Sequence, residues 1–233
     1  VREHPLAVRP PHRAGGAKAC IFLFMYGGPP QMDLFDYKPE LQRRDGQTIE
    51  IEQRRRDVKP GKLLGSKRTF RQHGRSGLWV SDALPQIATQ ADKLAVIKSL
   101  YCDSFAHGSA NLQMNCGRIL QGHPSLGAWL SYGLGTANEN LPAFVVMQDN
   151  SGTVVNGPRN WGAGFMPAVY QGTRILPGNE PIANLNTPEG VTDEQQRGKL
   201  DFLNAVNRQH ATTRPQQSEL DARIAAYELA FRM

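Results

Sequence analysis

The sequence predicts an α/β protein with a mostly parallel sheet flanked by helices and a helical hairpin near the C-terminal end. Short apolar runs occupy residues 19–26, 94–100 and 141–147, and helical patterns separate them. Strands that alternate with helices favour a parallel sheet, because each parallel pair needs a crossover connection. Residues 192–233 repeat apolar side chains at helical spacing, which predicts two amphipathic helices.

Length and composition indicate a globular chain with one folded domain. The 233 residues carry a net charge of +6, and the apolar content is ordinary. Three cysteines make no disulfide framework. Cys20 is expected to be a small core residue, and Cys102 and Cys116 are able to pair in an oxidising compartment.

Residues 1–18 are predicted to be an extended polar linker that remains after a leader has been removed. They are rich in Pro, Arg and His and lack the apolar centre of a signal peptide. The folded domain is therefore expected over residues 19–233.

The first apolar run ends abruptly in a loop that is rich in glycine and proline. The run from Cys20 to Tyr26 has no polar face, which favours a strand buried on both sides over a helix. Ligands bind beyond the carboxyl ends of such strands in open α/β sheets. Gly27 and Gly28 let the backbone approach a ligand there, and Asp33 follows nearby. A plain exit loop is the alternative interpretation.

The segment from Leu41 to Arg75 holds eleven Lys/Arg residues against four Asp/Glu residues. A basic tract can bind phosphate backbones, but this one lacks interleaved aromatic residues. The sequence therefore predicts a surface excursion with little regular structure and no nucleic-acid role. A short strand is expected near 78–80. A helix over 83–92 should follow, with Pro85 in its first turn.

A second polar set precedes the next helix, which should start near Gly108–Ser109 and end at Gly117. A helix start presents unpaired N–H groups that attract an anion. His107 and Ser109 are therefore candidate site residues. The alternatives are a hydrogen-bonded structural histidine and an ordinary helix cap.

Another helix is expected over 126–132, before the apolar run at 141–147. The long loop over 152–173 is rich in Gly, Asn and aromatic residues. It is either the wall of a pocket or a loop packed by its own Trp161 and Phe165. The predicted hairpin opens at Thr192 and resumes after Pro215. Its expected apolar faces are Leu200, Leu203 and Val206 on the first helix and Leu220, Ile224, Tyr227 and Phe231 on the second.

Several strings resemble a large bacterial family catalogued as domain of unknown function 1501. The motif from Phe22 to Pro39 looks like the opening motif of that family, and the similarity runs from about Pro10 to the end. Further matching strings are Asn115–Gly117, His123–Gly127, Tyr132–Gly135, Asn160–Gly172 and Tyr227–Met233. The family is sulfatase-like and is placed in the alkaline phosphatase superfamily.

The resemblance implies an alkaline phosphatase/sulfatase-like fold and export through a twin-arginine leader, to the periplasm or the cell exterior. It also implies a protein roughly twice this length. The chain would then be a fragment that forms an incomplete domain. The remaining ligands of a divalent metal are expected beyond Met233, and the chain alone should be inactive.

The resemblance also suggests roles for particular residues. Tyr26-Gly27-Gly28 stands where sulfatases place two aspartates, so Asp33 is the nearest candidate metal ligand. The sulfatase Cys-x-Pro-x-Arg motif is absent from the sequence. Counting back from Gly117, His107 falls in the position of the nucleophile and Ser109 follows. Gly27, Gly28 and Asn111 are candidate substrate contacts.

Two functions follow from these residues. The first is a metal-dependent hydrolase of small or polymeric sulfate or phosphate esters, with no nucleic-acid partner and no membrane span. The second is a non-catalytic exported binding protein that has kept the fold and lost the nucleophile.

Overall fold

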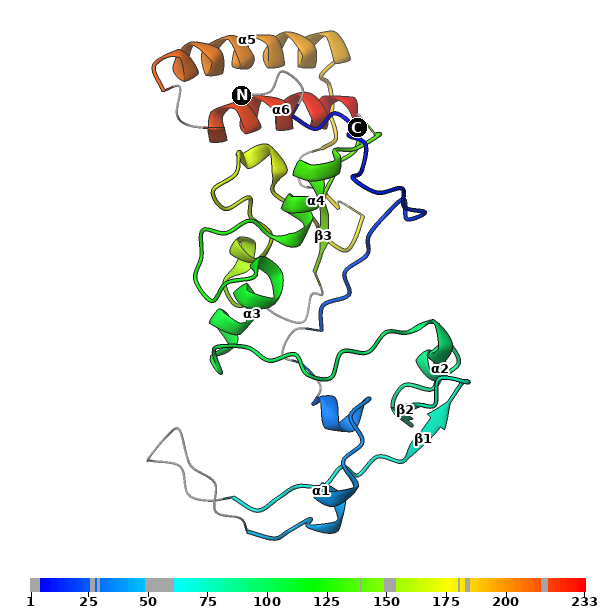
Figure 1. Ribbon diagram of the computed structural model, residues 1–233. Coiled ribbons are helices and arrows are strands. Elements are labelled where there is room, and N and C mark those ends of the chain that lie inside the picture. Colours follow the sequence, from blue (N-terminus) through cyan, green and yellow to red (C-terminus); the bar gives the residue numbers. More distant parts are fainter. Residues whose placement is uncertain are drawn as a thin grey trace. The chain divides into compact units, whose positions relative to one another are not determined.

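The computed structural model describes residues 5–25, 28, 30–48, 61–138, 140–148, 154–179, 181–182, 185–214 and 218–233. The chain divides into two compact units: residues 1–22 with 102–233, and residues 23–101. Both units contain helices and short strands, so the protein is a mixed α/β chain (Figure 1).

The smaller unit, residues 23–101, contains an antiparallel β-hairpin. Strand β1 (Phe70–His73) pairs with β2 (Leu78–Ser81). The carboxylate of Asp92 accepts hydrogen bonds from the backbone N–H groups of Arg75 at 3.0 Å and Ser76 at 2.8 Å. These two bonds close the hairpin tip and lower the pKa of Asp92, because they stabilise the charged carboxylate.

The other elements of this unit are short. They are η1 (Gln31–Asp33), α1 (Pro39–Arg43), α2 (Pro85–Ala88) and η2 (Ala91–Lys93). Pro85 begins α2, as predicted, but the helix expected over 83–92 is divided between α2 and η2.

The basic segment is largely irregular and exposed in its described part, as expected, and residues 49–60 lie outside that part. Strand β2 confirms the strand predicted near 78–80, whereas β1 was not predicted. The sequence of β1 is Phe-Arg-Gln-His, so its strand character comes from pairing with β2 and not from its own apolar pattern.

The larger unit holds the remaining elements. They are α3 (His107–Cys116), α4 (Leu126–Leu134), β3 (Val145–Met147), η3 (Gly157–Trp161), η4 (Ala168–Tyr170), β4 (Thr173–Ile175), α5 (Asp193–Thr212) and α6 (Ser218–Arg232). Strands β3 and β4 are parallel, with Val145 opposite Thr173 and Met147 opposite Ile175. The predicted helix over 126–132 is confirmed as α4, which ends at Gly135.

The core of this unit lies where the predicted long loop packs on α4. Ala128, Ala163, Met166 and Tyr170 form a buried cluster, and Leu6 packs against it. The ring of Tyr170 meets that of Tyr132 edge to face, with centroids 5.4 Å apart. The loop is therefore held by Ala163, Met166 and Tyr170, whereas Phe165 remains 66% exposed.

Residues 5–12, here named the N-terminal strap, are docked on the end of α4. The backbone carbonyls of Leu6 and Leu134 accept hydrogen bonds from the N–H groups of Thr136 and Arg9, each at 2.9 Å. The hydroxyl of Tyr170 donates to the carbonyl of Pro5 at 3.1 Å. Part of the segment expected to be a linker is thus packed on the larger unit.

Gly135 allows this docking because it has no side chain. Its φ angle is 70°, and a Cβ atom there would lie 2.1 Å from the carbonyl oxygen of Ala7. Any other residue would push the strap away and would also adopt backbone angles that are essentially restricted to glycine, at a cost of about 1–3 kcal/mol.

The predicted C-terminal hairpin is confirmed as α5 and α6, which lie side by side (Figure 1). Thr192 caps α5 by accepting from the N–H of Gln195 at 3.3 Å, while the Gln195 side chain accepts from the Thr192 N–H at 3.1 Å. This capping box explains why the helix begins there.

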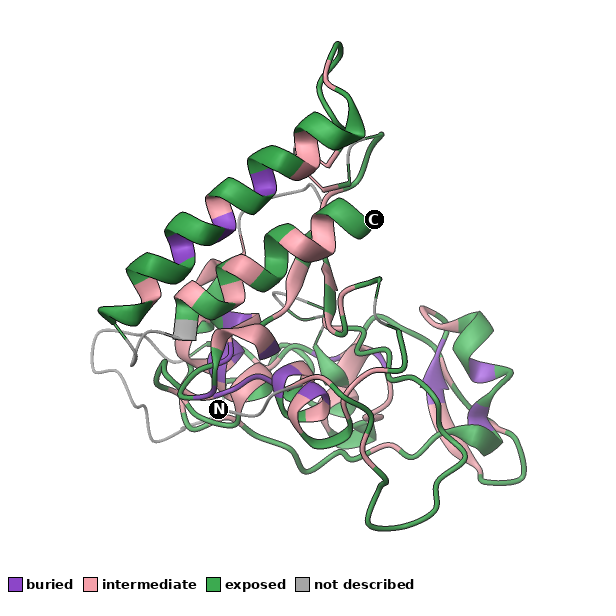
Figure 2. Ribbon diagram, turned by 90° about the horizontal axis from the view of Figure 1, so that it is seen from above, coloured by how far each residue is buried: buried purple, intermediate pink, exposed green. Residues whose placement is uncertain are grey.

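The inner face of α5 is more polar than expected. Leu200, Asn204 and Asn207 are its buried residues, whereas Val206 is 46% exposed (Figure 2). Arg197 makes a bidentate ion pair with Glu228 of α6, at 2.8 and 3.0 Å. This pairing lowers the pKa of the Glu228 carboxyl, because the charged form gains two strong hydrogen bonds.

Two expected strands are wrong, and a third is shorter than predicted. Described residues 19–25 and 94–100 form no strand, and Ile21, Leu23 and Ile97 are 83%, 84% and 66% exposed. Only 145–147 of the third run becomes a strand, and Met147 is 82% exposed. A strand needs a neighbour that completes its hydrogen-bond ladder, and an apolar run does not specify that neighbour.

The three cysteines are free, so Cys102 and Cys116 do not pair. Cys20 is exposed rather than buried. No helix in the described part of the chain is long and apolar enough to cross a lipid bilayer.

Candidate functional site

Helix α3 carries three of the six site residues predicted from the sequence, namely His107, Ser109 and Asn111. It begins at His107 and ends at Cys116, and Gly117 follows in a left-handed conformation with φ of 75°. This end agrees with the predicted glycine stop. The residue before the helix, Ala106, supplies no capping side chain. Within the described part of the chain no side chain caps this helix start, so the backbone N–H groups of its first turn are candidate donors to an anion.

His107 is exposed and is the first residue of α3. Ser109 is half-buried in the same turn and makes no cap hydrogen bond to this helix. The alternative of an ordinary helix cap for Ser109 is therefore wrong, since Ala106 occupies the capping position. The chemistry that these two side chains provide is a titratable ring and a hydroxyl beside free N–H groups.

Asn111 lies one turn further along α3. It is 8% exposed, and its Nδ2 atom is buried without a hydrogen-bond partner in the described part of the chain. Its backbone carbonyl accepts from the side chain of Asn115 at 2.9 Å. A buried amide without an acceptor costs about 1–3 kcal/mol, so Asn111 is a group that would gain from a ligand oxygen.

The loop before α3 is held by a reciprocal pair of hydrogen bonds. The backbone N–H of Asp103 donates to Oε1 of Gln113, and Nε2 of Gln113 donates back to the Asp103 carboxylate, each at 2.8 Å. Ser104 Oγ accepts from the N–H of Ala106 at 3.1 Å. These contacts fix the direction from which the chain enters the helix and hence the position of His107.

The segment that includes η3 holds α3 at both ends. Asn156, at φ of 69°, donates from Nδ2 to the carbonyl of Gly108 at 2.7 Å. At the other end, the Cys116 sulfur lies 3.6 Å from the carbonyl oxygen of Arg159. Burial raises the pKa of this thiol, because the thiolate is poorly solvated there. The helix is thus a fixed platform for His107.

A side chain at position 108 would be tightly packed against this segment. A Cβ atom on Gly108 would lie 3.3 Å from both Asn156 and Val155. The sequence indicated His107 and Ser109 as candidate site residues. It did not indicate that Asn156, Asp103 and Gln113 hold the helix start on which they lie. The Asn156-Gly157 pair was the available signal, because Asn is enriched in left-handed conformations.

The second half of the predicted site lies in the other unit. Gly27 lies outside the described residues, and Gly28 has φ of 47° with open space around it. The carboxylate of Asp33 accepts a hydrogen bond from the Ser66 hydroxyl. Asp33 and His107 belong to different units. The strand expected before the Gly27–Asp33 loop is absent from described residues 19–25, so the sheet edge predicted there is not found.

The described residues offer one candidate carboxylate but no complete metal site. No group of three or more His, Cys, Asp or Glu side chains comes together among them in a way that could hold a metal ion. The Asp33 carboxylate already has Ser66 as a partner. These residues do not by themselves fit a divalent metal, which takes several oxygen or nitrogen ligands.

The comparison with protein families gives one result. Residues 17–233 match the family described as "Protein of unknown function (DUF1501)". The match covers most of the chain, so the chain belongs to this family, as the sequence motifs suggested. No curated protein and no solved structure matches the chain.

Proposed function

We propose that this protein is a hydrolase of sulfate or phosphate esters of the sulfatase-like type, with its active site at the start of α3. The observation that carries the proposal is the exposed ring of His107 at a helix start without a capping side chain. The free N–H groups there suit the oxyanions of an ester, and the ring suits proton transfer. The family resemblance supports a metal-assisted reaction of this class.

Each of the α3 residues would have its own role in ester hydrolysis. The first-turn N–H groups bind the non-bridging oxygens of the ester. His107 holds or transfers the proton as water adds to sulfur or phosphorus and the bond to the alkoxy oxygen breaks. Ser109 would contact the same group, and Asn111 would offer as a further donor its Nδ2, which has no hydrogen-bond partner in the described part of the chain. Gly27 and Gly28 remain candidate backbone contacts, and Asp33 remains the candidate metal ligand from the other unit.

The test is hydrolysis of 4-nitrophenyl sulfate and 4-nitrophenyl phosphate by the full-length natural protein, purified without chelator. His107→Ala should reduce kcat/KM by about a hundredfold or more, the usual range for a general acid or base. His210→Ala is the matched control, since His210 is an exposed histidine on α5. Metal analysis of the same sample should find a stoichiometric divalent ion.

The opposite result identifies a structural histidine. If His107→Ala unfolds the protein, or leaves hydrolysis unchanged, the proposed role of the ring is wrong. If neither ester is hydrolysed and no metal is bound, the non-catalytic binding protein becomes the better hypothesis.

We also propose that the protein is exported, as the family resemblance implies. Fractionation of cells that express the natural gene should find the protein outside the cytoplasm. Recovery only with the cytoplasmic fraction would contradict this.

A further inference from the structure

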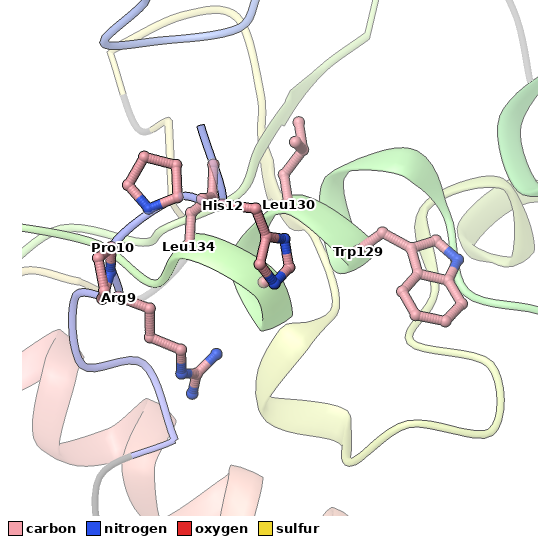
Figure 3. A pocket seen from close by; sticks show the side chains of 8 residues that line it. Arg9, Pro10, His12, Trp129, Leu130 and Leu134 are labelled. Carbon is pink, nitrogen blue, oxygen red and sulfur yellow. The ribbon is translucent and has the colours of Figure 1, made fainter. Parts of the chain in front are cut away.

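The strap and α4 border an open pocket that lies apart from the residues assigned to ester hydrolysis. Its volume is about 610 Å³, within the usual range for small-molecule sites. The strap contributes Arg9 and His12 with the two prolines between them, and α4 contributes Trp129 and Leu134 (Figure 3). All of these residues belong to the larger unit.

The two prolines place Arg9 and His12 on the same side of the strap. Proline fixes φ near −65° and restricts the residue before it to extended conformations. An extended proline-rich chain makes one turn every three residues, so positions 9 and 12 face the same way. Little conformational entropy is then lost when a ligand meets both side chains.

The pocket favours a negative charge. Residues 5–18 include Arg9, His12, Arg13 and Lys18 and no acidic residue, and the part of α4 that lines the pocket has none either. Such a local field attracts anions. Carboxylate or sulfate groups also accept the strong, charge-assisted hydrogen bonds that a guanidinium donates.

Arg9 has donor capacity that the described part of the chain does not use. One of its terminal nitrogens donates to the carbonyl of Pro5 at 2.6 Å, and the guanidinium carbon lies 5.7 Å from the centre of the Tyr132 ring. The other, Nη1, is buried without a hydrogen-bond partner. Since Arg9 also lines the pocket, a ligand acceptor is a candidate partner for this donor.

Trp129 supplies an aromatic surface to the same pocket (Figure 3). It is 47% exposed, and it meets Tyr132 and Phe165 edge to face, with centroids 6.3 and 6.0 Å away. These contacts hold the indole in place without covering it. A large exposed aromatic residue that is fixed in position can stack on a flat ring.

We propose that this pocket binds an aromatic anion: a flat ring that lies against Trp129 and carries a carboxylate or sulfonate group bonded to Arg9 and His12. The site does not depend on the proposed hydrolysis, because none of its residues lies in α3 or in the loop that contains Asp33. It is a binding site and involves no chemical step.

The test is isothermal titration of the chain with 2-naphthoate, with neutral 2-naphthalenemethanol and acetate as the comparison ligands. We expect 2-naphthoate to bind at least tenfold more tightly than either, because only it presents both the ring and the charge. Arg9→Gln and Trp129→Ala should each weaken its binding by about tenfold or more.

Arg13→Gln is the matched control, because it removes the same charge from an exposed strap neighbour that does not line the pocket. The affinity of the Arg13→Gln variant for 2-naphthoate should stay within about twofold of the wild-type affinity. If Arg9→Gln releases the strap, Trp129→Ala and His12→Gln test the site without removing the Arg9 contacts.

Three results of these comparisons would overturn the proposal. They are equal binding of the neutral alcohol, equal weakening by Arg13→Gln, or full affinity in Trp129→Ala. Absence of measurable binding by 2-naphthoate would overturn it as well.

Discussion

The cluster around Tyr170 and the run from Cys20 to Met25 are both rich in large apolar side chains, but their exposure is opposite. Tyr170 is 3% exposed and Ala128 is fully buried, whereas Ile21 and Leu23 are more than four-fifths exposed. The Tyr170 cluster receives side chains from α4, from the loop before β4 and from the strap. The described part of the run gains no strand partner. Burial thus depends on complementary segments and not on apolar content alone.

The largest expected effect is at the centre of the buried cluster. Tyr170→Ala should lower the free energy of unfolding by about 3 kcal/mol, because it leaves a cavity and removes the bond to Pro5. Urea denaturation of the chain measures this loss. The matched control is Tyr101→Ala, since Tyr101 is 83% exposed and its loss should cost less than about 0.5 kcal/mol. Equal losses of unfolding free energy in Tyr170→Ala and Tyr101→Ala would contradict the comparison between buried and exposed apolar regions.

A smaller effect is expected where the strap meets the end of α4. Gly135→Ala should cost about 2 kcal/mol, because the new Cβ would meet the Ala7 carbonyl and the residue would keep a positive φ. Gly133→Ala is the control: nothing lies within 4 Å of its Cβ position, and alanine favours the helix. In thermal unfolding, the melting temperature should fall in the order Gly133→Ala, wild type, Gly135→Ala. If Gly135→Ala is as stable as the wild type, docking of the strap does not contribute to the stability of the buried cluster.

The ion pair in the α5–α6 hairpin predicts a dependence on pH. The pKa of Glu228 is lowered in the folded state, mainly by its hydrogen bonds to Arg197. Its contribution to stability is therefore present above the unfolded pKa of about 4.5 and is lost as the pH falls through the lower folded value. Unfolding curves between pH 7 and pH 3 should show this loss in the wild type.

Glu228→Gln should reduce the acid-dependent loss, because the amide does not titrate. Glu219→Gln, an exposed carboxylate on the same helix, should leave the acid dependence as it is. If both variants keep the wild-type profile, the ion pair does not support the hairpin.

The smallest effect is expected in the exposed run. Leu23→Ser should change the free energy of unfolding by less than about 0.5 kcal/mol, because the side chain is 84% exposed. Leu112→Ala, at a residue of α3 that is 6% exposed, should cost about 2–5 kcal/mol in the same denaturation experiment. A loss above about 1 kcal/mol at Leu23 would show that the run is covered in solution.

Three predictions that rested on local signals were confirmed. The helix start at Thr192, the helix stop at Gly117 and the place of Pro85 at the start of α2 each depend on a few consecutive residues. Such signals act through neighbouring backbone groups, so the rest of the chain is not needed to interpret them.

The strand predictions failed because strands depend on distant residues. The run over 19–26 has the composition of a central strand, but no local feature states which segment should pair with it. Strand β1 shows the converse, since its polar sequence forms a strand only through its contact with β2. The described part of the chain instead holds two separate two-stranded sheets, one antiparallel and one parallel, and does not show the mostly parallel sheet that was predicted.

In the candidate site too, some features follow from local sequence and others depend on distant residues. The position of His107 at a helix start was readable, because the glycine at 117 sets the end of α3 and the helix extends back from it. The contact between Asn156 and Gly108 spans 48 residues, and the pair between Asp103 and Gln113 spans 10. Neither has a local pattern, so sequence reasoning missed the residues that hold His107.

The three cysteines differ in burial, so one of them can be labelled selectively. Cys20 is exposed, whereas Cys102 and Cys116 are half-buried and burial raises the pKa of the Cys116 thiol. Thiolates are the species that alkylating reagents attack, so a maleimide dye should modify Cys20 first. A spectroscopic label can thus be attached at the start of the apolar run without introducing a new cysteine. Its emission would report directly whether the run meets water or another surface.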